Sequence, residues 1–377
     1  MTRIRNTRII TTDHEIVGSL AFDQHLITEI DHGDSAQAEL DWQGDLLLPG
    51  MVELHTDNLE KHLMPRPKVA WPVMPAILAH DAQIAAAGIT TVLDAISIGD
   101  IDPDGVRMQT LDSCIAGLHQ AHAAGVLRAD HFLHLRLELP EKNLLTLFTP
   151  FLLDPLLKLV SLMDHTPGQR QWSDLAHYRT YMMGKRGWSA QKVEAMLDEM
   201  MTRQYQNVAS NRAAVLACCR DPSRPIPIAA HDDTTEQHVT DGVADGISIS
   251  EFPTSLAAAR AARKLGQQII MGGPNMVRGG SHSGNVSAAE LARADLLDAL
   301  SSDYVPASLL HAAFLLQNEG FALPKAIATV SRNPARMAGL TDRGDIAIGQ
   351  RADFLRVRVI DEVPIVIETW KAGSRIA

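Results

Sequence analysis

Short apolar runs alternate with longer helical segments through the middle of the chain, a pattern typical of repeated strand–helix units. The expected strands cover residues 46–57, 89–95, 131–138, 159–165, 226–232, 246–251, 268–272 and 296–303. Helices are predicted between most of them, for instance over 74–87, 106–125 and 255–265. Eight strands separated by helices favour a closed (β/α)8 barrel, with an open doubly wound sheet as the alternative.

Both ends of the chain have the pattern of short strands and turns instead. The expected strands lie at 8–11, 16–22 and 26–30 near one end, and at 352–359 and 364–370 near the other. Because neither end has enough strands to be stable alone, residues 1–48 and 343–377 are predicted to form one small composite β-domain. The barrel would then cover residues 49–342. Residues 168–220 form a predicted insertion after the fourth strand, mostly helical from Ser189 onward.

Composition narrows the classes of protein that fit. With 377 residues, 46% of them hydrophobic, the chain can build one large barrel and a small satellite. The net charge of −11, without a long basic block, argues against nucleic acid and anionic membranes as partners. The three cysteines show no metal-type spacing, no apolar run reaches 18 residues, and charged residues 13–15 interrupt any signal segment. We therefore expect a reduced, cytoplasmic protein.

Polar residues close several of the expected strands. His55 and Asp57 lie two residues apart, so in a strand both side chains point to the same side. In a (β/α)8 barrel the C-terminal strand ends meet on the catalytic face. Singly, each residue has a structural alternative: Glu138 could pair with Arg136, and Asp303 could cap a helix. Together they predict a metal site made of His55, Asp57, Glu138, His165, His231 and Asp303.

The donor set of this predicted site defines its chemistry. Imidazoles and carboxylates without thiolates suit Zn, Mn or Fe in a reactive site. Three of each exceed what one ion needs, so two divalent ions are expected. Glu138 is the candidate to bridge them, at a separation of about 3.5–4 Å.

Longer stretches carry a family resemblance. The segments PGMVELHTD (49–57), GITTVLD (88–94) and GDIAIGQRAD (344–353) resemble the amidohydrolase superfamily. The blocks HTDNLEKH (55–62) with PRPK (65–68), MDHTPGQRQ (163–171) and PNMVRGGSHSGN (274–285) are similar to α-D-ribose 1-methylphosphonate 5-triphosphate diphosphatases of the carbon–phosphorus lyase pathway. The resemblance covers essentially the whole chain. It implies a TIM-like barrel of the amidohydrolase type with a small composite β-sandwich from both termini.

One departure from the superfamily pattern stands out. The superfamily usually begins with His-x-His and takes later histidines from strands five and six. Here the second position is Asp57, and His165 and His231 close the fourth and fifth expected strands. Either this family differs, or the strand count is shifted by one.

The resemblance also implies a reaction. A ribose 5-triphosphate would be hydrolysed to a 5-phosphate and pyrophosphate, with the 1-methylphosphonate retained. Asp303, with no Lys or Arg nearby in the sequence, is the candidate general base for the attacking water. The alternatives are an amide or cyclic-amide hydrolase on the same binuclear scaffold, because fold does not fix function, and a scaffold protein without metals.

An anionic substrate requires local positive charge in a chain of net charge −11. Loops after the first, fourth and seventh strands offer such groups among glycines, which let backbone N–H groups approach phosphate. The expected substrate contacts are Arg66, Lys68, Gln169, Arg170, Arg278, His282, Ser283 and Asn285, with Arg170 and Arg278 as the main anion contacts. The alternative is a flexible surface loop. The expected partners are a small phosphorylated sugar and further copies of the same chain.

Overall fold

The computed structural model describes residues 1–33, 38–66, 69–100, 107–170, 175–281 and 284–377. Eight parallel strands form its central sheet, in the order in which they occur in the chain. They are β6 (Met51–Thr56), β7 (Ile89–Ile98), β8 (Asp130–Glu138), β9 (Leu157–Met163), β10 (Ile228–His231), β11 (Ile249–Glu251), β12 (Gln268–Gly272) and β13 (Ala299–Ser301). A parallel bridge from Thr56 to Asp303 brings the last strand back to the first. The barrel prediction is confirmed, and the open doubly wound sheet is wrong.

Alternation along β8 shows how the barrel is filled. Leu133, Leu135 and Leu137 pack among the residues of the surrounding helices. The intervening side chains face inward, as the two-residue period of a strand requires. The barrel interior further from the C-terminal strand ends is apolar. It is formed by Leu54, Leu93, Leu159, Ala229, Ile249, Ile270 and Ala299. The inward residues nearer the end of β8, His134, Arg136 and Glu138, are polar, so the interior changes character toward its C-terminal end.

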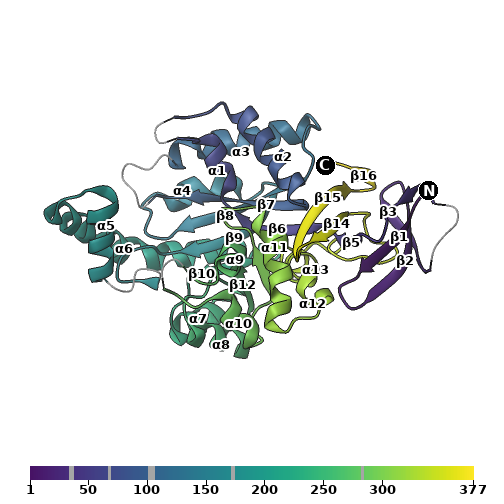
Figure 1. Ribbon diagram of the computed structural model, residues 1–377. Helices are drawn as coiled ribbons and strands as arrows, with labels where there is room; N and C mark the ends of the chain where they lie inside the picture. Colours follow the sequence, from purple (N-terminus) through teal and green to yellow (C-terminus); the bar gives the residue numbers. More distant parts are fainter. Residues whose placement is uncertain (34–37, 67–68, 101–106, 171–174, 282–283) are drawn as a thin grey trace.

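Helices follow most barrel strands and surround the sheet (Figure 1). Several begin where a serine or threonine side chain accepts a backbone N–H, as Ser255 does from Ala258. The helices are α1 (Asn58–Leu63), α2 (Val73–Ala86), α3 (Arg107–Ala123), α4 (Leu144–Phe148), α7 (Glu236–Ala244), α8 (Leu256–Lys264), α9 (Gly273–Arg278), α10 (Ala288–Arg293), α11 (Ser308–Leu315), α12 (Leu323–Ala328) and α13 (Arg332–Met337), with 3-10 turns η1 (Thr149–Phe151) and η3 (Leu316–Glu319).

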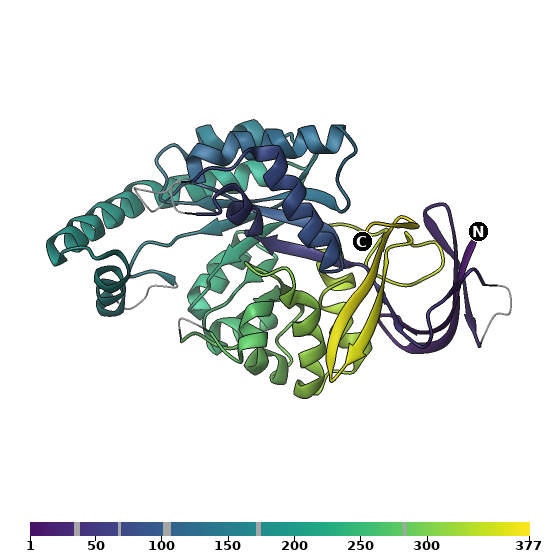
Figure 2. The ribbon, with the colours of Figure 1, turned by 45° about the horizontal axis from the view of Figure 1, so that its top comes forward.

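The insertion after the fourth strand is helical, as predicted. It contains α5 (Leu175–Arg186) and α6 (Ala190–Cys219), and Ser189 caps α6 by accepting the N–H of Lys192. The two helices project from the barrel on the side away from the chain termini (Figures 1 and 2). Across the described ranges, no helix combines the length and apolar character needed to cross a membrane.

Strands from both termini form a second sheet beside the barrel (Figure 2). Its order is β16-β15-β14-β5-β1-β2-β3, with β4 paired to β1. Phe22, Phe354 and Trp370 form an aromatic cluster in its core. The exact domain limits stay a prediction. The strands are β1 (Thr2–Ile10), β2 (Glu15–Asp23), β3 (Leu26–His32), β4 (Leu40–Asp41), β5 (Leu46–Pro49), β14 (Phe354–Ile360), β15 (Val363–Lys371) and β16 (Ser374–Arg375).

The apolar run at 46–57 is not one strand, which corrects the sequence prediction. Its first part is β5 of the terminal sheet, and its second part is β6 of the barrel. The chain changes sheets at Gly50, where an added Cβ would lie 2.4 Å from Oγ1 of Thr90. Hydrophobicity alone cannot mark this point, because both strands are fully buried.

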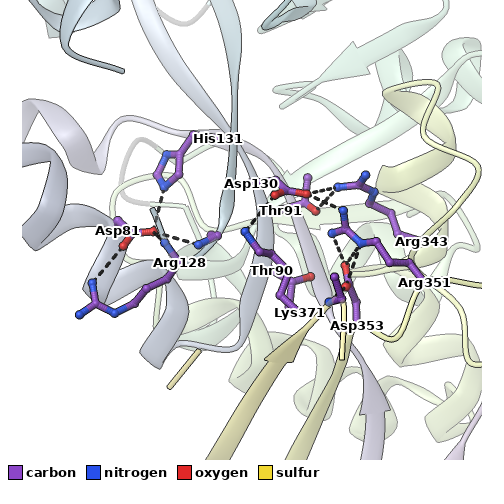
Figure 3. Close-up of polar contacts among 12 residues, drawn as sticks. Asp81, Thr90, Thr91, Arg128, Asp130, His131, Arg343, Arg351, Asp353 and Lys371 are labelled. Atoms are coloured by element: carbon purple, nitrogen blue, oxygen red, sulfur yellow. Dashed lines mark hydrogen bonds and ion pairs between the residues drawn. The ribbon is translucent and has the colours of Figure 1, made fainter. Parts of the chain in front are cut away.

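Ion pairs join the N-terminal end of the barrel to the C-terminal part of the chain (Figure 3). Asp130, at the start of β8, forms ion pairs with Arg343 at 2.7 Å, Arg351 at 2.6 Å and Lys371 at 3.0 Å. Burial raises the pKa of Asp130, but the charges of these cations outweigh it and hold that pKa well below its usual range. At this end of the barrel, the protein supplies the partners of its own charges.

Candidate active site

A cavity of about 350 Å³ opens at the C-terminal ends of the barrel strands. It is lined by residues of barrel strands one, three, five and seven and by residues that follow strands four to eight. The lining includes His55, Arg136, His165, His231, Asp232, Phe252, Met271, Asn275, Arg278, Asn285, Asp303 and Tyr304. Four of the six predicted metal ligands therefore lie around one space.

Glu251 holds two of these histidines. The Nδ1 atoms of His55 and His231 each lie 2.7 Å from one of its carboxylate oxygens, and Ser161 Oγ donates to it at 2.7 Å. Burial raises the pKa of Glu251, but the neighbouring imidazoles and these hydrogen bonds keep it well below its usual value. Since a carboxylate accepts only, each Nδ1 carries the proton. The Nε2 lone pairs of both rings are left for another partner.

His165 is oriented by a carboxylate in the same way. Its Nδ1 makes a short hydrogen bond to Oε1 of Glu138. Burial lowers the pKa of His165, but the Glu138 charge and hydrogen bond outweigh it, so that pKa is raised. On the other side of the ring, Nε2 lies 3.8 Å from Oδ2 of Asp232, and Nε2 of His231 lies 3.5 Å from the same oxygen. His165, His231 and Asp232 thus converge as a metal-type group, and His55, His231 and Glu251 form a second.

Unpartnered oxygens test whether a divalent ion fits here. Oδ1 of Asp57, Oε2 of Glu138 and Oδ2 of Asp232 are buried and have no hydrogen-bond partner. A buried carboxylate oxygen without a partner is costly, and a divalent cation would satisfy it. The donor set therefore fits divalent ions, although Asp57 and Glu138 do not themselves line the cavity at the strand ends.

Asp303 reaches the cavity through a backbone link between the last strand and the first. Its N–H donates to the carbonyl of His55 at 3.0 Å, and its carbonyl accepts the N–H of Asp57 at 3.1 Å. Its φ is +52°, a conformation that costs energy for any residue but glycine. The closure of the barrel therefore sets the place of the Asp303 carboxylate beside His55.

The predicted substrate contacts fall into different places. Arg278 and Asn285 line the cavity, whereas exposed Arg66 and half-buried Gln169 do not. Arg170 donates to the carbonyl of His231 and, at 2.7 Å, to Oδ1 of Asp233. Its charge is therefore neutralised by a fully buried carboxylate. Lys68, His282 and Ser283 lie outside the described residues.

Three charged residues of the site, Asp232, Glu251 and Arg136, were not among the predicted site residues, although Glu251 was the one possible ligand at the end of the sixth expected strand. Asp232 directly follows the fifth strand and Glu251 closes the sixth, so the strand-end rule could have found both. Arg136 shares a strand face with Glu138 by the same spacing that groups His55 with Asp57. The strand count was correct: His165 follows the fourth barrel strand and His231 ends the fifth. The departure from the superfamily pattern is a property of this chain.

Comparisons with known proteins agree with this geometry. Residues 82–376 match the model of an amidohydrolase family. An α-D-ribose 1-methylphosphonate 5-triphosphate diphosphatase of Escherichia coli (strain K12) is 44% identical over 377 residues, which is 99% of both chains.

Two solved structures share the fold at low identity. The N-acetyl-D-glucosamine-6-phosphate deacetylase of Mycobacterium smegmatis has a TM-score of 0.64 at 14% identity, over 100% of both chains. A 5-methylcytosine deaminase of Klebsiella pneumoniae has a TM-score of 0.64 at 16% identity, over 100% of this chain and 98% of that one. These likenesses concern the fold alone, whereas the match over residues 82–376 and the full-length relative concern descent. The chain belongs to the amidohydrolase family.

Proposed function

We propose that this protein hydrolyses α-D-ribose 1-methylphosphonate 5-triphosphate to the corresponding 5-phosphate and pyrophosphate, as a step of phosphonate catabolism. The 44% identical relative over 99% of both chains bears that substrate's name. The observation that carries the proposal is the cavity itself. It has a volume of about 350 Å³, and both a metal-type donor set and Arg278 line it. That volume suits a phosphorylated sugar.

Two divalent ions, Zn, Mn or Fe, are the proposed cofactors. His55, His165 and His231 would supply imidazole ligands, and the unpartnered oxygens of Asp57, Glu138 and Asp232 would supply the carboxylates. Glu138 remains the proposed ligand shared between the two ions: its Oε1 orients His165, and its unpartnered Oε2 would be the oxygen offered to them. When bound, such ions would activate water and neutralise charge on the transferring phosphoryl group.

The protein's own residues position the reaction. Asp303 takes the proton of the attacking water, from a position fixed by its backbone bonds to the end of β6. Glu251 keeps His55 and His231 in one tautomer and orientation. Arg278, exposed at the mouth of the cavity, holds the part of the polyphosphate that leaves as pyrophosphate.

Arg170 has a different proposed role. Its guanidinium bridges Asp233 and the carbonyl of His231, so it fixes the end of β10 and thereby the His231 ring. We therefore leave it out of the anion contacts and keep Arg278 and Asn285. Contacts by Arg66, Lys68, Gln169, His282 and Ser283, and assembly into a homo-oligomer, stay predictions.

The test compares two substrates, a triphosphate and a cyclic amide. The protein loaded with Mn²⁺ or Zn²⁺ is incubated with the ribose triphosphate, and separately with a cyclic amide such as a hydantoin. We expect pyrophosphate from the first and no ring opening of the second. An Asp303→Asn protein serves as the control for contaminating activity. Ring opening without pyrophosphate release would favour the amide hydrolase instead.

A further inference from the structure

Arg136 is a buried cation with no hydrogen-bond or ion-pair partner among the residues that the structure describes. It lies on β8 with 7% of its surface exposed, and it lines the cavity together with His55, His165 and His231. Its Nε atom is buried and makes no hydrogen bond. Among the described residues, no carboxylate lies within ion-pair distance of its guanidinium, and no side chain or carbonyl accepts from it.

The obvious internal partner does not take this role. Glu138 lies two residues further along the same face of β8, but its Oε1 accepts from His165. Its Oε2 has no hydrogen-bond partner, and neither has Nε of Arg136. Pairing of Glu138 with Arg136, one of the alternatives offered by the sequence, is therefore absent from the structure.

The proposed metal ions cannot be the missing partner either. They would add positive charge within the same cavity and make an unpaired guanidinium still less favourable. A buried arginine beside a metal-type centre favours an anion in direct contact with it. Glu138 is near enough for the charge of Arg136 to help lower its pKa, but no carboxylate of the described residues pairs with the guanidinium. The anion must come from the bound molecule.

We propose that Arg136 binds the phosphoryl group that is hydrolysed, by donating N–H groups to its non-bridging oxygens. Its planar fork matches two oxygens of a tetrahedral phosphoryl group. Because Arg136 is buried beside the imidazoles and Arg278 is exposed at the mouth, the two arginines serve different phosphates of one chain. This inference rests on the proposed function and deepens it.

The position of Arg136 would also favour phosphoryl over amide substrates. A neutral amide in the cavity would leave the guanidinium desolvated and unpaired, whereas a phosphoryl group would neutralise it. The residue would therefore act against the amide hydrolysis that the same scaffold could support.

The experiment uses the full, metal-loaded protein with inorganic phosphate as the probe. Calorimetry should show phosphate binding weakened at least tenfold in Arg136→Met and less so in Arg136→Lys, with metal content unchanged. For the ribose triphosphate, kcat/KM should fall about 10²- to 10³-fold in Arg136→Met. Removal of an unpaired buried charge should also leave the ligand-free melting temperature unchanged or higher.

Arg212→Met is the matched control. Arg212 is paired with Asp245 at 2.6 Å and does not line the cavity. Its loss should lower the melting temperature while phosphate affinity and kcat/KM stay as in the wild type, the opposite pattern to Arg136→Met.

The outcomes separate this inference from the proposed function. If the wild type binds phosphate through Arg136 but releases no pyrophosphate, the proposed function fails and the anion site stands. If the wild type releases pyrophosphate and Arg136→Met keeps wild-type phosphate affinity and kcat/KM, the inference is overturned. Should Arg136→Met fail to fold, Arg136→Lys decides, because wild-type phosphate binding by the lysine variant would contradict a bidentate contact.

Discussion

The two ends of strand β8 treat charge in opposite ways. At its start, Asp130 is surrounded by Arg343, Arg351 and Lys371 (Figure 3). Near its end, Arg136 is more deeply buried than Asp130 and has no partner among the described residues. At the start of the strand, charged side chains pair with one another and hold parts of the chain together. Near the end of the strand, Arg136 is left for the bound molecule that we propose to be its partner.

A second comparison concerns two groups that could both hold a metal ion by distance alone. On the helix-facing side of the barrel, His80 and His131 share Asp94, and His131 also contacts Asp81 (partly in Figure 3). Nδ1 of His80 accepts from Asn58 at 3.0 Å, so all four ring nitrogens have partners. Around His165 and His231, by contrast, carboxylate oxygens are left over. Unsatisfied donor atoms, more than proximity, distinguish a candidate metal centre from a structural network.

The largest expected effect is at the metal centre. Glu138→Ala removes both the partner of His165 and an unpartnered oxygen. Metal and pyrophosphate release should be lost together, because ligand number and geometry set metal affinity. Elemental analysis beside the activity assay checks this, and a variant with two tight metal equivalents and full activity would remove Glu138 from the ligands.

Asp303→Asn separates proton transfer from metal binding. The backbone bonds that hold residue 303 are unchanged by this substitution. Metal content should stay near the wild-type level while kcat falls about 10²- to 10⁴-fold, the range for a lost general base. If metal is lost in proportion to the rate, Asp303 acts as a ligand instead.

The His131 network gives a stability effect that depends on pH. Burial lowers the pKa of His131, but the charge of Asp94 and the hydrogen bonds to Asp81 and Asp94 outweigh it and raise that pKa to about 9. The usual pKa is about 6.5. A raised folded-state pKa stabilises fully below the unfolded value and less as pH rises through about 9, so about 3 kcal/mol should be lost between these limits.

Denaturant unfolding at pH 6.5 and 9.5 measures this loss. His131→Gln cannot be protonated, so the difference between wild type and variant should shrink as pH rises. A difference that stays constant across the range would show that His131 is neutral in the folded protein.

Asp130→Asn tests the satisfied end of β8. The substitution leaves Arg343, Arg351 and Lys371 without a shared counter-charge. We expect a loss of about 2–3 kcal/mol in the free energy of unfolding, below the range for fully buried pairs because Asp130 is 27% exposed. The kcat/KM of the folded variant should not change. Reduced kcat/KM in fully folded protein would mean that the two ends of the strand are coupled.

The sequence could predict the barrel because most barrel strands are separate apolar runs, and several of these runs close with a polar residue. His55, His165, His231 and Asp303 were found by that rule, and the structure places all four around one cavity. The two-residue spacing of a strand also places Arg136 on the same face as Glu138. Spacing in the sequence, however, cannot show whether a charged side chain has a partner in the fold.

Pairing over long distances set the limits of prediction. The sequence suggested Arg170 for an anion because it is a loop arginine, whereas the fold brings it against Asp233, 63 residues away. In the same way, the change of sheets at Gly50 depends on how closely Thr90 and Asp353 approach it. Such contacts are properties of the folded chain, and no local pattern encodes them.

Of the two cavity arginines, Arg278 should show the smaller effect on kcat/KM, because it is exposed where Arg136 is buried. Solvent competes for its guanidinium, and an exposed contact to phosphate is worth less than a desolvated one. Arg278→Ala should lower kcat/KM at least tenfold with metal content unchanged, mainly through KM. Arg278→Lys should show a smaller loss of kcat/KM, which should still be measurable because lysine cannot make the paired contact. Steady-state kinetics on both variants measures this. An effect of Arg278→Ala larger than that of Arg136→Met would reverse the assigned order of the two arginines, and wild-type kinetics would exclude Arg278 from the polyphosphate site.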